Sequence, residues 1–185
     1  MKKSSFFTLL IIAFVLACFL TPLGDFFKVR LNRIFAASPA IIELENCGKI
    51  DSYNWKLKDG KWDFFNFNKS KGNVVFINFW ASWHLPSRAQ FKEIETLYEQ
   101  YGDRVDFYLI TDEEREPAEE FLNKNKYNLP ITYQIIGEPA PLPLLPPPGC
   151  YLLDKNGYIR IHQTDISDWT NGKVTDVIDE ILAEK

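Results

Sequence analysis

The residue types that most often carry chemistry are scarce in this chain and widely spaced. It has three cysteines, Cys18, Cys47 and Cys150, and two histidines, His84 and His162. No two cysteines form a Cys-x-x-Cys pair, so the sequence contains no obvious dithiol for disulfide exchange. A zinc site needs several nitrogen or sulfur ligands clustered together. We therefore expect no metal site, and we find no motif that calls for a cofactor.

The one close pair of candidate catalytic residues is His84 and Ser87, three positions apart. This spacing brings two side chains together on a helix. A serine nucleophile also needs an orienting acid for its base, and no such acid is evident in the sequence. The alternative is that both are polar residues at a helix start, with Ser87 bonding to the backbone.

A strand and a helix must position this pair. Val74–Phe79 is almost entirely apolar, which is typical of a strand buried on both faces. Proline at position 86 suits a helix start, and apolar residues then recur at helical spacing until Gly102, a good helix stop. Residues 105–110 predict the next strand. Two apolar strands joined by a helix predict a right-handed βαβ unit.

The segment between that strand and helix resembles a known active-site pattern. Trp80-Ala81-Ser82-Trp83-His84-Leu85-Pro86-Ser87-Arg88 is similar to the Trp-Ala-x-Trp-Cys-x-Pro-Cys-Arg motif of the TlpA/ResA-like disulfide reductases, membrane-anchored members of the thioredoxin superfamily. The resemblance implies an α/β, thioredoxin-like fold with a central mixed β-sheet flanked by helices and an N-terminal β-hairpin. His84 and Ser87 stand where that family has its two cysteines.

The rest of the chain fits a single thioredoxin-like domain over residues 53–185. Residues 53–57 and 62–67 alternate around an Asp-Gly turn and predict a hairpin. A helix is expected from residues 113–116, and a last helix carries apolar residues from 174 to 182. Residues 151–153 and 158–161 predict a second hairpin. The proline-rich residues 129–150 predict a stiff, extended loop, and the resemblance implies that Pro148 is cis and faces the turn.

Three interpretations of the cysteines remain open. Cys150 follows Pro148 by two residues, so we expect it close beneath the His84 turn. It is either an inert buried residue, a lone reactive thiol, or the partner of Cys47 in a disulfide, which requires their Cα atoms to lie within about 7 Å. We also expect a binding surface at Trp80, Trp83, His84 and Pro148. Either both tryptophans form an exposed rim there, or Trp80 packs under the turn.

Residues 1–37 predict a targeting or anchoring segment. Two lysines precede an uncharged stretch, residues 4–24, that is just long enough to span a bilayer. An uncleaved signal anchor is preferred over a lipoprotein at Cys18 or cleavage near residues 36–38. Residues 26–35 predict an amphipathic stalk, and residues 38–52 a linker. We therefore expect a membrane-anchored domain on the periplasmic or extracytoplasmic side.

The partners expected are the inner membrane and another envelope protein. A net charge of −4 and a pI of about 5.3 argue against nucleic acid. Our first hypothesis is a thioredoxin-fold binding or scaffold module that lacks dithiol catalysis. The alternative is an atypical thiol-disulfide oxidoreductase that uses Cys150, with or without Cys47, and this would require a thiol of lowered pKa.

Overall fold

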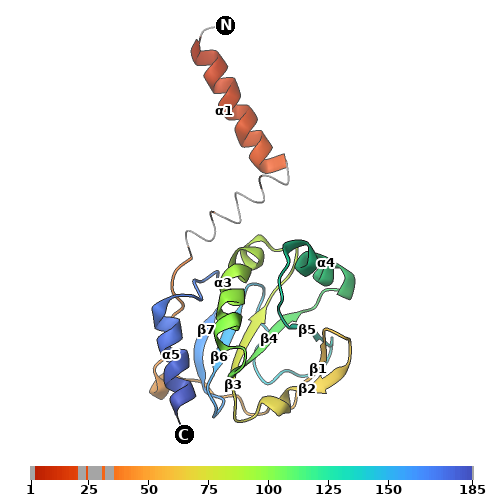
Figure 1. Ribbon diagram of the computed structural model, residues 1–185, viewed down its shortest axis with the longest axis vertical. Coiled ribbons are helices and arrows are strands. Elements are labelled where there is room, and N and C mark those ends of the chain that lie inside the picture. Colours follow the sequence, from red (N-terminus) through yellow and green to blue (C-terminus); the bar gives the residue numbers. More distant parts are fainter. Residues whose placement is uncertain (1–2, 21–23, 25–30, 32–35, 185) are drawn as a thin grey trace.

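The computed structural model describes residues 3–20, 24, 31 and 36–184 (Figure 1). The helices are α1 (Lys3–Leu20), α3 (Leu85–Tyr101), α4 (Arg115–Asn125) and α5 (Gly172–Ala183), with short 3-10 turns at η1 (Leu44–Asn46) and η2 (Phe67–Ser70). The strands are β1 (Lys56–Asp59), β2 (Phe64–Asn66), β3 (Val74–Phe79), β4 (Val105–Thr111), β5 (Ile131–Gln134), β6 (Cys150–Leu153) and β7 (Ile159–Gln163).

The seven strands form one mixed sheet in the order β2-β1-β5-β4-β3-β6-β7. The central strands β5, β4 and β3 are parallel, and the outer pairs are antiparallel. Strand β3, helix α3 and strand β4 make the expected βαβ unit, with Val74 opposite Val105. The predicted α/β architecture, a mixed sheet flanked by helices with an N-terminal hairpin, is confirmed.

Each face of the sheet has its own hydrophobic core. On one face, α3, α4 and α5 pack against alternate strand residues such as Phe76 and Leu109. Figure 1 shows α3 and α5 lying across the front of the sheet. On the other face, Val75 and Ile77 belong to a second cluster with Trp55 and Phe67. Burial of β3 on both faces explains its continuous apolar sequence.

Both predicted hairpins are present. In the first, β1 pairs with β2, and the turn after Asp59 places Trp62 at a positive φ of 69°. In the second, the Asp154 carboxylate accepts hydrogen bonds from the backbone N–H groups of Asn156 and Tyr158, and Gly157 takes the left-handed conformation that the turn requires.

The extended loop predicted for residues 129–150 is wrong at its start, because β5 lies within it. Strand β5 pairs with β4 on one side and β1 on the other, so it is an interior strand of the sheet. Its residues Ile131, Thr132 and Tyr133 favour extended structure and are buried. Pro130 precedes the strand, where its missing N–H costs no ladder bond. The remaining prolines lie in the loop that leads to β6.

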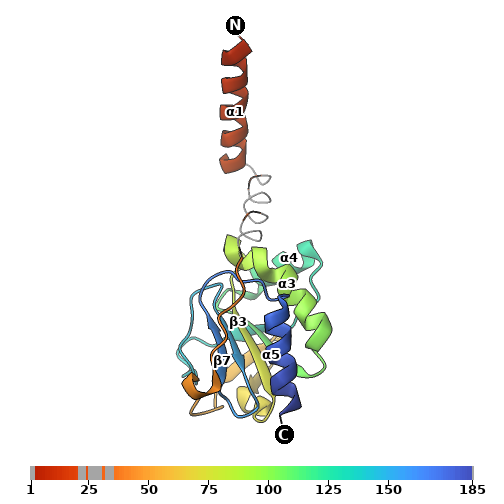
Figure 2. The same cartoon turned by 90° about the vertical axis from the view of Figure 1, so that its left-hand side faces the viewer.

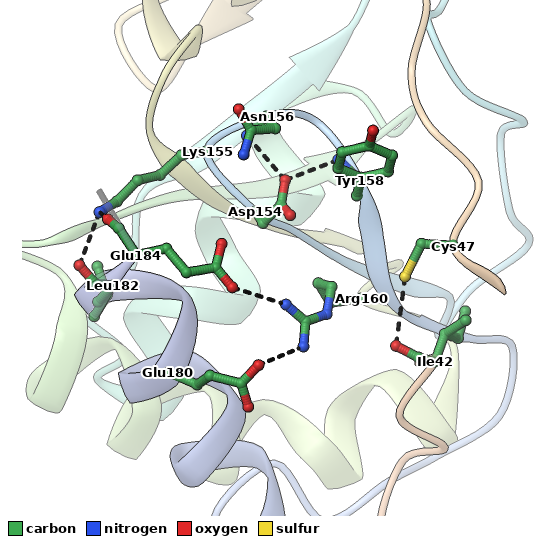
Figure 3. Close-up of polar contacts among 10 residues, drawn as sticks. All are labelled: Ile42, Cys47, Asp154, Lys155, Asn156, Tyr158, Arg160, Glu180, Leu182 and Glu184. Atoms are coloured by element: carbon green, nitrogen blue, oxygen red, sulfur yellow. Dashed lines mark hydrogen bonds and ion pairs between the residues drawn. The ribbon is translucent and has the colours of Figure 1, made fainter. Parts of the chain in front are cut away.

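The C-terminal helix is fastened to the second hairpin by two basic side chains (Figure 3). The guanidinium of Arg160 on β7 donates to Glu180 at 2.9 Å and to Glu184 at 3.3 Å. The ammonium of Lys155 donates to the carbonyl oxygens of Leu182 and Glu184. Cations at a helix C-terminus satisfy carbonyls that have no partner within the helix.

Residues 37–50, which include most of the expected linker, lie along the outer edge of β7 (Figure 2). The Ile42 N–H donates to the carbonyl of Arg160 at 2.8 Å, and the Ile159 N–H donates to the carbonyl of Gly48 at 2.8 Å. This segment therefore pairs with the last strand of the sheet over part of its length.

The expected apolar N-terminal helix is present as α1. In the part of the chain that the structure describes, none of the helices combines the length and apolar character needed to cross a bilayer. The expected span over residues 4–24 includes residues 21–23, which lie outside the described residues. The predicted stalk at residues 26–35 also lies outside them, apart from Leu31.

Candidate functional site at the start of helix α3

The candidate site is the turn between β3 and α3. The chain leaves the sheet at Trp80, and the His84 N–H donates to the carbonyl of Ala81 at 3.2 Å to close the turn. His84 takes the N-cap position of α3 with extended backbone angles, and its side chain makes no capping bond. Pro86 follows in the first turn, where a missing N–H is harmless.

The structure brings His84 and Ser87 together, as their spacing predicts. The His84 Nδ1 and the Ser87 hydroxyl lie 3.1 Å apart. Burial lowers the pKa of His84 from its ordinary value, so the imidazole is neutral near pH 7 and can accept or donate this hydrogen bond. The Trp83 ring meets the imidazole edge-on at 5.6 Å.

This pair lacks two features of a hydrolytic centre. Ser87 is completely buried, so its hydroxyl cannot reach a substrate. Among the described residues, no carboxylate hydrogen-bonds to His84 to orient it as a base. A serine nucleophile requires both access and an oriented base. The geometry therefore favours the structural interpretation of the His84–Ser87 contact.

The two tryptophans of the turn have different environments. Trp80 is 1% exposed and donates its indole N–H to the carbonyl of Leu109 at 3.1 Å. Its ring packs against Phe91 and Phe121, so of the two alternatives for Trp80 the structure shows the buried one, in which it packs under the turn. Trp83 is 69% exposed and presents its ring to solvent beside His84.

Cys150 begins β6 opposite Asn78, two residues before Trp80, and so lies close to the turn. The peptide bond between Pro147 and Pro148 is cis, as the resemblance implies, and Pro148 is buried. The Cys150 thiol accepts a hydrogen bond from the Asn78 amide at 3.1 Å. The Gln90 amide donates to the carbonyl of Pro148 at 3.1 Å and lies 3.8 Å from the same sulfur. The sulfur is thus enclosed by two buried amides.

The environment of Cys150 opposes thiolate chemistry. Burial raises the pKa of this thiol to about 12, and the amides of Asn78 and Gln90 only partly offset that rise. A nucleophilic cysteine requires a lowered pKa and some exposure. The thiol of lowered pKa that the redox alternative requires is therefore not found at Cys150.

Cys47 and Cys150 are both free, so the disulfide considered from sequence is not formed. Cys150 lies opposite Gln163 at one end of β7, whereas the carbonyl of Gly48, next to Cys47, accepts from Ile159 at the other end. Four residues of strand span about 13 Å, beyond the reach of a disulfide. Cys47 instead donates to the carbonyl of Ile42 (Figure 3), and burial raises its pKa.

Sequence reasoning missed Glu113, which holds the turn from the side. Its carboxylate accepts hydrogen bonds from the Ser82 N–H at 2.6 Å and from the Ser82 hydroxyl at 2.7 Å. Glu113 follows β4, and Ser82 follows the neighbouring parallel strand β3. Polar residues placed just after adjacent parallel strands meet at one edge of the sheet. That signal was present in the sequence.

A metal centre has no support within the described part of the chain, where no three His, Cys, Asp or Glu side chains cluster as ligands. The other histidine, His162, is exposed and stacks on Tyr151 with ring centres 4.8 Å apart. It lies on β7 and takes no part in the turn.

Comparison with known proteins identifies the family. The model of the AhpC/TSA family matches residues 51–162, which is more than half of the chain. The chain belongs to the AhpC/TSA family. Two curated relatives of this AhpC/TSA chain are the thioredoxin-like protein YneN of Bacillus subtilis, 26% identical over 58% of the chain, and the thiol-disulfide oxidoreductase ResA of Bacillus thuringiensis, 30% identical over 48%. The matches span 65% of YneN and 53% of ResA, less than two thirds of each.

Solved structures confirm the thioredoxin-like fold of this AhpC/TSA chain. A DsbE candidate from Chlorobium tepidum superposes with a TM-score of 0.62 at 20% identity, covering 74% of this chain and 99% of its own. A DsbF homologue from Corynebacterium diphtheriae gives 0.59 at 16% identity, covering 80% and 93%. A secreted thiol-disulfide isomerase from Corynebacterium glutamicum gives 0.58 at 18% identity, covering 81% and 95%. At these identities the likeness concerns the fold alone.

Proposed function

We propose that this AhpC/TSA chain is a thioredoxin-fold binding module that does not catalyse dithiol exchange. It would present the turn at the start of α3 and the adjoining edge of the sheet to a protein partner. In this proposal His84 and Ser87 replace the two cysteines of the TlpA/ResA-like pattern, and their mutual hydrogen bond stabilises the helix start. The exposed Trp83 supplies an aromatic contact, a residue type enriched at protein interfaces.

The burial and raised pKa of Cys150 are the observation that carries this proposal. It is the cysteine close to the turn, it has no exposed surface, and its pKa is raised to about 12. Disulfide exchange begins with attack by a thiolate and needs a second sulfur to resolve the mixed disulfide. Neither role has a residue at this turn.

The cellular setting is part of the same proposal. The ResA and YneN relatives support a place among TlpA/ResA-like proteins, and one structural neighbour is described as secreted. Lysines at positions 2 and 3 precede the uncharged residues 4–20 of helix α1. These features support anchorage through the N-terminal segment, with the domain on the extracytoplasmic side and an envelope protein as partner.

An insulin-reduction assay with dithiothreitol tests the catalytic part of the proposal. The full chain should precipitate insulin no faster than dithiothreitol alone, and Cys150→Ser should behave identically. The positive control is the double variant His84→Cys with Ser87→Cys, which places a dithiol at the start of α3. The single variant His84→Cys lacks the second, resolving sulfur and serves as its matched negative control. Acceleration by the unmodified chain that disappears in Cys150→Ser would overturn the proposal in favour of the redox alternative.

A further inference from the structure

A small acidic pocket lies beside the turn, at the carboxyl ends of β4 and β5. Its volume is about 220 Å³, and its walls include Trp62 from the first hairpin, Asp112 and Glu114 from the loop after β4, and Tyr133 and Ile136 from β5 and the residues beyond it. Ligands of α/β proteins bind preferentially at this edge of a parallel sheet. The neighbouring Glu113 connects the pocket to the turn through Ser82.

The pocket carries an excess of negative charge. Three carboxylates, Asp112, Glu113 and Glu114, line it against the single ammonium of Lys58. Glu113 is engaged by Ser82, whereas Asp112 and Glu114 are exposed and hydrogen-bond to no side chain in the described part of the protein. Two carboxylates are therefore available to a ligand, and carboxylates form their strongest hydrogen bonds with cationic donors.

One residue that lines the pocket, Tyr133, has a buried hydroxyl without a hydrogen-bond partner in the described part of the chain. Tyr133 is 3% exposed, and its oxygen makes no hydrogen bond within the described residues. Burial raises the pKa of this phenol and the Glu119 carboxylate adds to the rise, while Arg115 and a side-chain contact with Trp62 offset part of it, so the hydroxyl is neutral and can donate or accept. Leaving such a group unpaired is unfavourable. The Trp62 ring packs against the Tyr133 ring, with ring centres 5.7 Å apart and planes tilted by 54°.

The aromatic and apolar parts of the pocket suit the stem of a long basic side chain. The ammonium of Lys58 already lies 4.0 Å from the centre of the Trp62 ring, which shows that this ring face accepts a cation. Ile136 is 88% exposed and forms an apolar rim. Pockets for drug-sized molecules have volumes of about 300–1,000 Å³, so this pocket has the size for a single side chain.

We propose that this acidic pocket binds the cationic side chain of a lysine or arginine presented by a partner protein, a specific form of the binding function proposed above. The charged head lies between Asp112 and Glu114, and the stem packs on Trp62 and Ile136. As the Trp62 ring yields, an N–H of the cation reaches the hydroxyl of Tyr133. This contact would satisfy the hydroxyl that is unpaired in the free chain.

An NMR titration of the full chain at low ionic strength tests the site directly. The probes are the N-acetyl, N-methylamide derivatives of lysine and arginine, with the norleucine derivative as the uncharged control and butylammonium as a free amine. The charged derivatives should shift the Trp62 indole signal, and the norleucine derivative should not. Binding of only one charged derivative would support the proposal and identify the preferred cation.

Variants separate specific binding from general attraction. Asp112→Asn combined with Glu114→Gln should weaken binding at least fivefold, whereas Glu120→Gln, an exposed carboxylate outside the pocket, should leave it unchanged. Lys58→Gln should strengthen binding because it removes the competing cation. Tyr133→Phe should weaken binding without lowering the melting temperature, since no hydrogen bond of the free chain is lost.

Several results would overturn this assignment. They are equal binding of the norleucine derivative, no response to either charged derivative, or equal weakening by the Glu120 control. Tighter binding of butylammonium than of the amino-acid derivatives would assign the pocket to free amines and reject a protein side chain. These readouts do not involve sulfur, so insulin reduction by the chain would refute the redox-inactive function while leaving this site intact.

Discussion

Replacing Glu113 should loosen the turn that begins α3. Its carboxylate receives two hydrogen bonds from Ser82, at 2.6 and 2.7 Å, and it joins β4 to a turn 31 residues earlier in the chain. Hydrogen bonds to charged groups contribute about 1.5–3 kcal/mol when buried. Both residues are only partly buried, so we assign about 1 kcal/mol to each bond after allowing for solvent screening.

Glu113→Ala should therefore lower the free energy of unfolding by about 2 kcal/mol, and Glu113→Gln, which keeps one acceptor oxygen, by about 1 kcal/mol. For a chain of this size the alanine variant corresponds to a fall in melting temperature of about 4–8 °C. Urea unfolding monitored by circular dichroism gives the free energies. Glu120→Gln, on the exposed surface of α4, is the matched control and should stay within about 0.5 kcal/mol of the parent.

A double-mutant cycle with Ser82→Ala isolates the side-chain bond between these residues. The coupling energy should be about 1 kcal/mol, because both single variants remove the same hydroxyl–carboxylate contact. Hydrogen exchange at the Ser82 amide should also speed up in Glu113→Ala. A coupling energy indistinguishable from zero, together with a Glu113→Ala stability equal to that of the control, would refute the reasoning.

Three further predictions follow from individual side chains. Burial lowers the pKa of His84 below its value in the unfolded chain, so its contribution to stability should be complete above about pH 6.5 and should be lost as the pH falls toward the folded pKa. In urea titrations at several pH values, His84→Gln should flatten this part of the stability profile. Cys150 should resist alkylation at pH 8 until the chain unfolds, whereas the half-buried Cys47 should react in the native state; equal rates would contradict the enclosed thiol. Arg160→Met should lower the free energy of unfolding by about 1–2 kcal/mol, because the buried guanidinium loses two carboxylate partners that are themselves partly exposed. In the same assay Glu180→Gln should lower the free energy of unfolding by less than about 1 kcal/mol.

The strand, turn and helix that form the site could be predicted because the sequence patterns that indicate them involve only neighbouring residues. The continuous apolar run of β3 and the helical spacing of α3 depend on neighbouring residues, so strand, turn and helix were expected in the right order. His84 and Ser87 are three residues apart, and helix geometry alone brings them together. The resemblance to a known motif supplied the cis bond at Pro148, which the residues alone do not indicate.

The rest depends on contacts between distant segments. Strand β5 is only four residues long and stands among prolines, and its identity as a strand follows from pairing with β1 and β4. The different exposure of Trp80 and Trp83 depends on Phe121, a residue of α4, which covers only the first of them. The Glu113–Ser82 clamp likewise exists only once two parallel strands lie side by side.

The pairing of residues 37–50 with β7 has a consequence for how copies of this chain meet. An uncovered strand edge is a template for pairing with another molecule and a common origin of aggregation. Here the preceding segment occupies part of that edge, through Ile42 and Gly48. At the opposite edge, β2 is three residues long, and Lys56 and Lys58 lie over its Phe64 ring. A shortened chain beginning at Tyr53 would expose the β7 edge, and we expect it to self-associate at lower concentrations than the full chain does.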